Sequence, residues 1–347
     1  MYKNMKRIII IIAVLIGVSS CYGDYVMDYD YSAAYAAYQY DLRTFVCGEK
    51  VEVGFTTALG GVITNDQDRK VAVEIDNSIL TSDLSVFDPR HFAASFTAID
   101  GLLGKAPIGS VSQDYVTAEI KASGISSLAA LPESYYTTSG PVTIKKGYHT
   151  GNLLIYPTEE MFTDSKILKP YYALGFVIRS ADADSVLTNK SFQIMAVKVE
   201  NRFWGNWYHG GRKVVVNNST GAITSDVHYE LTFPQSDASL CSLTTEGFHS
   251  VLTNKMSNES GSLRLTFNAD DNEITVEDVS GAKELKPIKG QPSHHNGAKL
   301  IQDREIYLNY SYSDGASATT YVTDTLRFRN RIRDGINEWQ DENTENY

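Results

Sequence analysis

The 347-residue sequence contains few cysteines, three in the whole chain. One of them, Cys21, follows an apolar run near the N-terminus, which leaves Cys47 and Cys241 for the remaining sequence. Two cysteines this far apart imply no disulfide framework, and two free buried thiols are the expected outcome. Their spacing also lacks the pattern of a zinc site, so the sequence predicts no metal and no cofactor.

Positive charge is also scarce, because 31 Lys and Arg stand against 42 Asp and Glu, for a net charge of −11. Loss of residues 1–20 would remove three positive charges and no negative ones, which brings the net charge to −14. An acidic chain repels phosphate backbones and anionic lipid surfaces. The composition therefore argues against nucleic acid as a partner, and against membrane contact through surface charge.

Motifs for covalent chemistry are missing, including a Gly-rich phosphate loop, a Gly-x-Ser-x-Gly elbow and a Cys/His arrangement. The adjacent His294 and His295 lie in a Gly/Pro segment that reads as a loop without partner ligands. Paired carboxylates occur in turn-like contexts that need no function, at Asp182 and Asp184, Asp270 and Asp271, and Glu159 and Glu160. We predict that the protein is not an enzyme. An unrecognised glycoside hydrolase remains an alternative, because spacing does not reveal convergent carboxylates.

An apolar run covers residues 8–16 and follows three positive charges, which is typical of a secretory signal. It is too short for a transmembrane helix, which needs about 20 apolar residues. Ser19 and Ser20 directly before Cys21 form a pattern that resembles a bacterial lipobox. We therefore predict a signal peptide over residues 1–20 and a lipid anchor at Cys21, and an ordinary signal peptide with a coincidental cysteine is the alternative.

Residues 21–30 carry three aspartates among tyrosines. This stretch resembles the acidic export signal that sends lipoproteins of Bacteroidota to the outer cell surface, and a solvated acidic tether has the same composition. The expected location is the outer membrane, facing the cell exterior, with membrane contact only through the lipid anchor.

Long helical stripes are absent, and apolar residues alternate with polar ones over most of residues 31–200. Tyr31, Tyr35 and Tyr38 fall at helical spacing, but Tyr38, Tyr40 and Leu42 also alternate, so we predict a strand there. Connections between the strands vary in length. This favours an all-β fold that begins with an immunoglobulin-like sandwich domain over residues 31–200.

From residue 201 to residue 347 the sequence indicates consecutive hairpins with breaks at 217–221, 268–272 and 313–317. A long antiparallel meander closes most easily into a barrel, because closure removes exposed edges. We predict a second domain with a lipocalin-like barrel or a curled sandwich. If its inward residues Leu263, Leu265 and Phe267 line a cavity, the domain would carry a lipid or another apolar small ligand.

Several stretches together resemble the surface lipoproteins built from domain-of-unknown-function family 1735 followed by its companion family 4361. The resemblance spans nearly the whole mature chain, and it rests on "AYQYDLRTFVCGE", "VGFTTALGGV", "LPESYYTTSGPVTIKKGYHTG", "FWGNWYHGGR" and "LNYSYSDGASATTYVTDTLRFRNRIRDGINEW".

The resemblance implies glycan handling beside starch-utilisation-type transport systems of the outer membrane, and an outer-membrane transporter complex as a further partner. The first domain also occurs before some family 18 glycosidases, but this sequence lacks their Asp-x-x-Asp-x-Asp-x-Glu cluster. Residues 81–130 form an insertion relative to the family pattern.

Aromatic residues are plentiful, with 22 tyrosines and three tryptophans. One ring stacked on a sugar removes on the order of 100 Å² of apolar surface from water, which contributes roughly 2.5 kcal/mol. The candidate ligand-binding residues are Trp204, Trp207, Tyr208 and His209. Because they lie where the two domains join, packing at that interface is the alternative. We predict a non-catalytic glycan-binding accessory of a polysaccharide-uptake system.

Overall fold

The computed structural model describes residues 31–80, 110–229, 240–268, 272–315, 317–341 and 343–346. The predicted Cys21 anchor, the first part of the insertion and Asp270 with Asp271 lie outside these residues. The described chain is nearly all β, which confirms the predicted fold class, and its single α-helix is α3 (Ser110–Ser123). We call residues 31–200 the N-terminal body and the described residues after 200 the C-terminal body.

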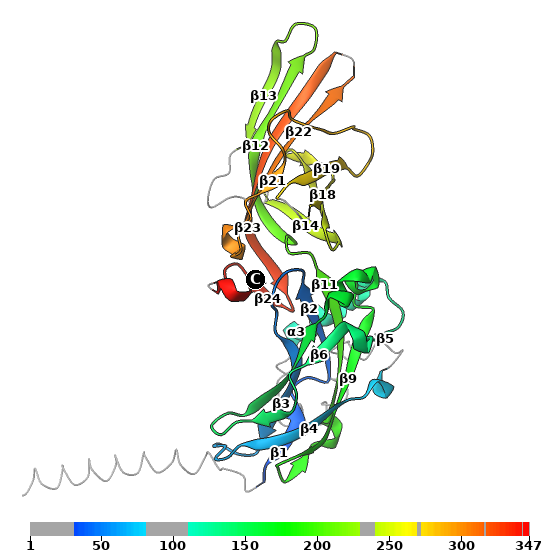
Figure 1. The fold of residues 1–347 in the computed structure, drawn as a ribbon, viewed down its shortest axis with the longest axis vertical. Helices are drawn as coiled ribbons and strands as arrows, with labels where there is room; N and C mark the ends of the chain where they lie inside the picture. Colours follow the sequence, from blue (N-terminus) through cyan, green and yellow to red (C-terminus); the bar gives the residue numbers. More distant parts are fainter. Residues whose placement is uncertain are drawn as a thin grey trace, which may run out of the picture.

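The N-terminal body is a sandwich of two sheets (Figure 1). The first sheet has the order β10 (Ser185–Val186), β1 (Ala33–Ala36), β3 (Val53–Gly60), β8 (Thr150–Pro157) and β6 (Tyr136–Thr138). The second has the order β2 (Tyr40–Val46), β11 (Phe192–Glu200), β9 (Tyr172–Ala181), β4 (Arg69–Ile75) and β7 (Val142–Ile144), with β5 (Ala129–Ala130) beside β9.

The sandwich core lies between these sheets, because alternate residues of each strand point inward. Phe55 of β3 stacks on Phe176 of β9 with ring centroids 5.3 Å apart, and both side chains are fully buried. Helix α3 covers the outer face of the second sheet, where its Val116 and Ile120 pack in one cluster with Ile194. Short 3-10 turns connect the strands: η1 (Asn77–Ile79), η3 (Glu133–Tyr135), η4 (Glu159–Thr163), η5 (Ser165–Leu168) and η6 (Thr188–Lys190).

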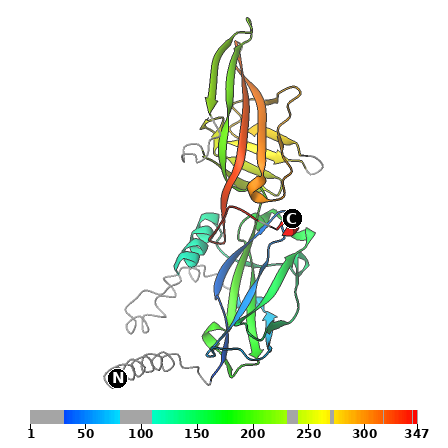
Figure 2. The same ribbon diagram turned by 90° about the vertical axis from the view of Figure 1, so that its left-hand side faces the viewer.

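The C-terminal body is one strongly curled antiparallel sheet (Figure 2). Its order is β19 (Ile274–Asp278), β18 (Leu263–Phe267), β15 (Ser250–Thr253), β14 (Leu240–Gly247), β12 (Gly205–Asn217), β23 (Ala318–Arg333), β22 (Glu305–Asp314) and β20 (Lys286–Pro287). Beside this path lie β13 (Ile223–Tyr229), β21 (His294–His295), β24 (Ile336–Glu338), the pair β16 (Lys255–Met256) and β17 (Glu259–Ser260), η8 (Ile301–Asp303) and η9 (Thr344–Asn346).

The three predicted hairpin breaks are confirmed, since β12 and β13, β18 and β19, and β22 and β23 flank them. The two ends of the meander nearly meet. The amide of Ile274 donates to Ser293 at 2.8 Å, and the amide of His295 donates to Asn272 at 2.9 Å. His294 and His295 therefore form a short strand, which corrects the prediction of a loop.

Apolar side chains form one cluster inside the curled sheet. Leu263, Leu265 and Phe267, which were expected either to line a cavity or to fill it, are buried in one core cluster with Trp207 and Tyr310. Dispersion contacts of this kind stabilise a fold. This packing weighs against the alternative function, in which the second domain carries an apolar ligand.

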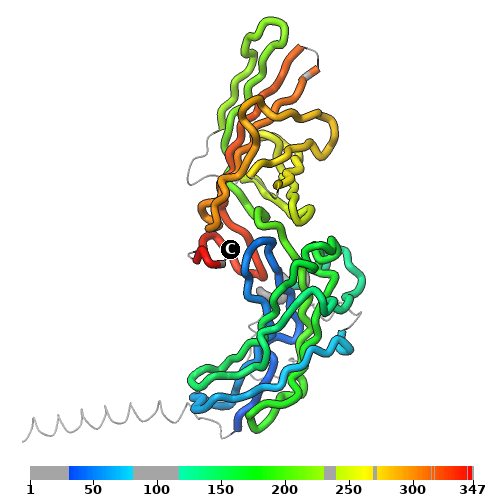
Figure 3. The backbone as a smooth tube through the Cα atoms, in the orientation of Figure 1, coloured from blue at the N-terminus to red at the C-terminus, as the bar shows by residue number. Residues whose placement is uncertain are grey.

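Buried charges join the two bodies. Glu49, in the turn after β2, accepts hydrogen bonds from Arg304 at 2.9 Å and from Arg331 at 2.7 Å, and each of these side chains is at most 4% exposed. The turn between β23 and β24 also reaches β2, where the amide of Thr44 donates to Asp334 at 3.3 Å. The paths of β23 and β24 beside β2 are visible in Figure 3.

Separate fragments test the predicted domain boundary. Fragments 21–200 and 202–347 should each keep a β-sheet circular dichroism spectrum and a cooperative melt, because each retains its own core. Each should melt below the full chain, since Glu49 is separated from Arg304 and Arg331. If both fragments are unfolded while the full chain melts in one transition, the boundary is wrong.

Candidate functional site

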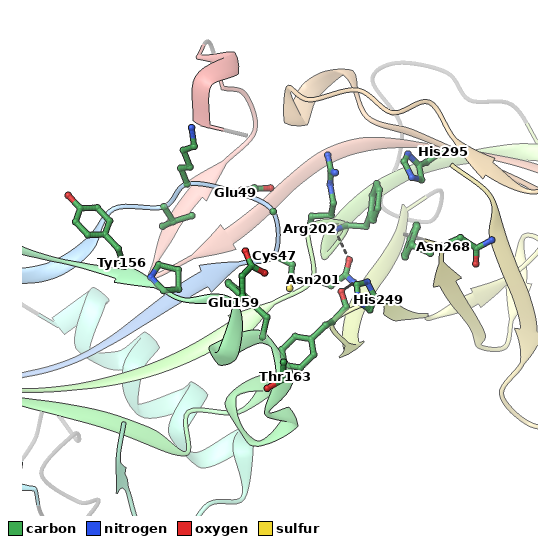
Figure 4. Close-up of a pocket in the computed structure, with 18 of the residues that line it drawn as sticks. Cys47, Glu49, Tyr156, Glu159, Thr163, Asn201, Arg202, His249, Asn268 and His295 are labelled. Carbon is green, nitrogen blue, oxygen red and sulfur yellow. Dashed lines mark hydrogen bonds between the residues drawn. The ribbon is translucent and has the colours of Figure 1, made fainter. Parts of the chain in front are cut away.

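A groove of about 1230 Å³ lies where the two bodies meet (Figure 4). The N-terminal body contributes the turn after β2, the end of β8 and η4. The C-terminal body contributes residues 201–203, the β14–β15 turn and the segment around Asn268 and His295. The groove exceeds the roughly 300–1,000 Å³ of a pocket for a drug-sized ligand, so it has room for a chain of several small units.

Aromatic rings from several segments line this groove. Tyr156 at the end of β8 is 44% exposed, because it alternates with the fully buried Ile155 on the same strand. Phe162 of η4 and Phe248 of the β14–β15 turn are half-buried and meet edge to face with centroids 6.4 Å apart. These rings give the groove apolar surface from both bodies.

Neutral polar side chains also line the groove. Asn268, Asn272 and His249 are exposed there and offer amide and imidazole groups to the groove. The side chain of Asn201 differs from these three, because backbone groups of two lining segments already occupy its hydrogen-bonding atoms. Its Nδ2 donates to the carbonyl of Phe248 at 2.9 Å, and its Oδ1 accepts from the amide of Phe203.

Glu49 belongs to both the groove and the buried ion network. Burial raises the pKa of Glu49, but the hydrogen bonds and charges of Arg331 and Arg304 outweigh burial and hold the pKa below its usual value. Glu49 is therefore an ionised structural residue, and it carries no proton that it could donate in acid catalysis. Arg304 connects this ion network to another lining residue of the groove, because its Nη1 donates to the carbonyl of Arg202 at 2.5 Å.

Cys47 lines the groove as a free thiol, and Cys241 is free and buried in the other body, as predicted. Burial raises the pKa of Cys47 to about 12, with the nearby carboxylates of Glu200 and Glu49 adding to the shift. A thiol with such a pKa is not a thiolate at neutral pH, so Cys47 is not poised as a nucleophile.

The structure separates the four residues predicted to bind a ligand. Trp207 is fully buried in the C-terminal core, where its Nε1 donates to the carbonyl of Phe203 at 3.1 Å. His209 is also buried, with its Nε2 3.2 Å from a carboxylate oxygen of Asp324. Neither ring presents a face to solvent, because successive inward positions of β12 point into the curled sheet. Tyr208 lies between them on the outer face and is half-buried.

Trp204 lies at the junction of the two bodies. Its ring has the Lys198 ammonium at 6.0 Å from the N-terminal body and the Arg331 guanidinium at 5.9 Å from the C-terminal body. These cations approach the ring from side chains that are themselves at most 7% exposed. The contacts match the packing alternative for this residue.

Tyr156, Phe162, Phe248 and Asn268 were not predicted as site residues. The alternation in "GNLLIYP" places Tyr156 on the solvent side of its strand, so the exposure of this ring could have been predicted from the sequence. Nothing in the sequence pairs it with residues about one hundred positions later. Glu159, predicted as a turn residue without function, begins η4 and lines the groove.

Among the described residues no cluster of three potential metal ligands occurs. Within the same ranges, none of the helices is long and apolar enough to cross a membrane.

No family model and no curated protein matches the chain. Among solved structures, a protein of unknown function from Bacteroides ovatus aligns with a TM-score of 0.59 at 19% identity, covering 90% of this chain and 99% of that one. That similarity shows a shared fold. Membership of domain-of-unknown-function family 1735 stays a prediction.

Two further solved structures are more distant. A multidomain protein from Bacteroides ovatus that includes family 1735 has a TM-score of 0.39 at 14% identity, covering 89% of this chain and 100% of that one. An auxiliary nutrient binding protein from Bacteroides thetaiotaomicron has a TM-score of 0.34 at 12% identity, covering 86% and 95%. At these TM-scores neither structure indicates the ligand of this chain.

Proposed function

We propose that this protein is a surface-anchored, non-catalytic lipoprotein that binds a glycan in the groove between its two bodies, as an accessory of a polysaccharide-uptake system. The observation that carries the proposal is the combination of aromatic rings, including the exposed Tyr156, with the neutral side chains of Asn268 and Asn272 in one open groove. Sugars present flat C–H faces to aromatic rings and hydroxyls to amides, so both kinds of lining are needed.

The expected affinity is modest. Two or three stacked rings and the hydrogen bonds to the amides supply several kcal/mol, and the cost of association offsets part of this gain. Dissociation constants in the micromolar to millimolar range follow, which suit a tethered receptor that meets a polymer at several points. An outer-membrane transporter complex is the proposed destination of the captured glycan.

The proposal is tested by affinity electrophoresis against plant, host and microbial glycans, paired with a reducing-end assay on each polymer that retards the protein. Retardation without new reducing ends is the expected result. Glu52 and Glu159 also line the groove, so released ends that disappear in Glu52→Gln or Glu159→Gln would establish a hydrolase instead. If no glycan binds while a fatty acid raises the melting temperature, the protein is a carrier of apolar ligands and not a glycan receptor.

The proposed anchor is tested at Cys21, which follows Ser19 and Ser20 in the sequence. The wild-type protein should fractionate with outer membranes and begin with an acylated cysteine by mass spectrometry, because several acyl chains make an effectively permanent anchor. Cys21→Ala should be released or remain an uncleaved precursor. Unchanged membrane retention of this variant, together with a wild-type N-terminus free of lipid, contradicts the anchor.

A further inference from the structure

Three segments that each carry an exposed apolar side chain lie at the end of the N-terminal body farthest from the C-terminal sheet, where β1 and the β3–β4 and β7–β8 loops are found (Figure 1). These side chains are Tyr31 before β1, Ile63 in the β3–β4 loop and Tyr148 in the β7–β8 loop, with exposed fractions of 56%, 51% and 67%. We call these three residues the apolar tip. Exposed apolar residues that stand singly are common, but several on adjoining segments at one end of a body indicate an interaction surface.

Close backbone approaches and hydrogen bonds hold the three segments together. Gly61 stands so close to the start of the described chain that a Cβ there would lie 2.0 Å from the Tyr31 carbonyl oxygen. The amide of Gly147 donates to the Asn65 carbonyl at 2.8 Å, and Asn65 Nδ2 donates to the Tyr148 carbonyl at 3.0 Å. Asn65 is only 1% exposed, so the two loops form one braced platform.

We propose that the apolar tip seats in the interface of the lipid bilayer that carries the anchor, so that the protein stands on its membrane. This inference rests on the proposed lipid anchor, and it departs from the expectation that the anchor is the only membrane contact. Cys21 precedes Tyr31 by ten residues, which reach at most about 35 Å when extended. An anchored chain therefore enters the folded protein at the tip and holds it close to the lipid surface, where a weak contact acts at a high effective concentration.

The chemistry of the tip fits the boundary between headgroups and acyl chains. Tyrosine rings are enriched at that depth, because they have an apolar body and a polar hydroxyl. Lys145 and Lys146 lie beside Tyr148 and are exposed, while Asp66 and Asp68 lie in the facing loop. Asp68 accepts from Lys145 Nζ at 3.0 Å and from the Lys146 amide at 2.8 Å, which leaves little net charge to repel lipid phosphates.

This seating has a consequence for the groove. The hairpins β12–β13 and β22–β23 project from the opposite end of the molecule, and the groove lies between the two ends (Figure 1). A protein that stands on the tip would hold the groove above the membrane, where a polymer reaches it from the side.

The test couples Cys21 of the mature chain to a maleimide lipid, so that the anchor is present whether or not natural acylation occurs. Burial raises the pKa of the Cys47 and Cys241 thiols to about 12 each, so coupling should select Cys21, and Cys21→Ser serves as the coupling control. The coupled protein is placed on phosphatidylethanolamine and phosphatidylglycerol vesicles whose acyl chains carry bromine, a fluorescence quencher.

The variant Tyr148→Trp is compared with the parent, whose three native tryptophans give the background. The introduced indole should shift to the blue and lose at least half of its emission, and Ile63→Ser in the same chain should reduce that quenching. The matched control is Tyr321→Trp on the C-terminal sheet, a 39% exposed tyrosine whose introduced indole should stay unquenched. An unquenched indole in fully coupled Tyr148→Trp, or equal quenching in both variants, overturns the proposal. Dimerisation of the uncoupled protein through the apolar tip would also overturn the proposal.

Discussion

Replacing Trp207 with Ala should lower the free energy of unfolding by about 3–5 kcal/mol, the usual cost of removing a large buried ring. The indole is fully buried, meets Phe328 edge to face at a centroid distance of 5.4 Å and donates its N–H to Phe203. At about 2–4 °C per kcal/mol, the melting temperature falls by roughly 10 °C in a thermal scan.

The matched control for this variant is Trp339→Ala, because Trp339 is 57% exposed in the same body. Its melting temperature should stay within about 1–2 °C of wild type, since exposed substitutions usually change stability by less than 0.5 kcal/mol. Loss of glycan retardation in Trp207→Ala with an unchanged melting temperature is the outcome that contradicts packing. It would make Trp207 a sugar platform.

Replacing Glu49 with Gln should cost a similar amount, about 3–5 kcal/mol, because it takes the Glu49 carboxylate from two buried guanidinium groups and leaves Arg331 with Glu338 alone. Gln keeps the size of the side chain, but it removes the charge that Arg304 and Arg331 share. The loss should appear as a lower melting temperature of the full chain. Binding in the groove should weaken as well, since Glu49 and Arg202 line it and Arg304 connects them.

The pH dependence separates this ion network from simple packing. The pKa of Glu49 is lowered in the folded protein, so its stabilisation is present above the unfolded pKa of about 4.3 and is lost as pH falls through the folded pKa. The difference between wild type and Glu49→Gln should therefore shrink below about pH 4. Glu52→Gln, an exposed change three residues away, is the control and should melt like wild type. A pH-independent difference would show that charge is not the cause.

Local pattern was enough to predict the strands and hairpins. Alternation in "KVEVGF" fixes which residues of β3 point into the sandwich, and Gly221 in its turn marks the β12–β13 hairpin with a φ of 72°. The Tyr31 to Tyr38 segment shows the limit of periodicity. Two periods fitted that segment, and the structure forms two strands there, β1 and then β2 with Tyr40 and Leu42, while Tyr38 lies between them.

The groove could not be predicted from the sequence, because its residues meet only through the joining of two bodies. Phe162 and Phe248 are 86 positions apart, and neither has a sequence pattern that specifies the other. Glu49 reads as an ordinary turn carboxylate, yet Arg331 meets it from the far end of the chain. The prediction chose residues 204–209 because two tryptophans lie there. Composition shows which rings a chain has but not which of them are buried, and Trp207 is buried.

Affinity electrophoresis of Tyr156→Ala on the retarding glycan tests the central claim most directly, because this ring is the most exposed aromatic side chain among the residues named for the groove. The matched control is Tyr148→Ala, a 67% exposed tyrosine outside the groove lining. The account predicts that Tyr156→Ala weakens binding by roughly ten-fold or more with an unchanged melting temperature, while Tyr148→Ala binds like wild type. Wild-type retardation of Tyr156→Ala, or equal loss in both variants, would contradict a glycan site in this groove.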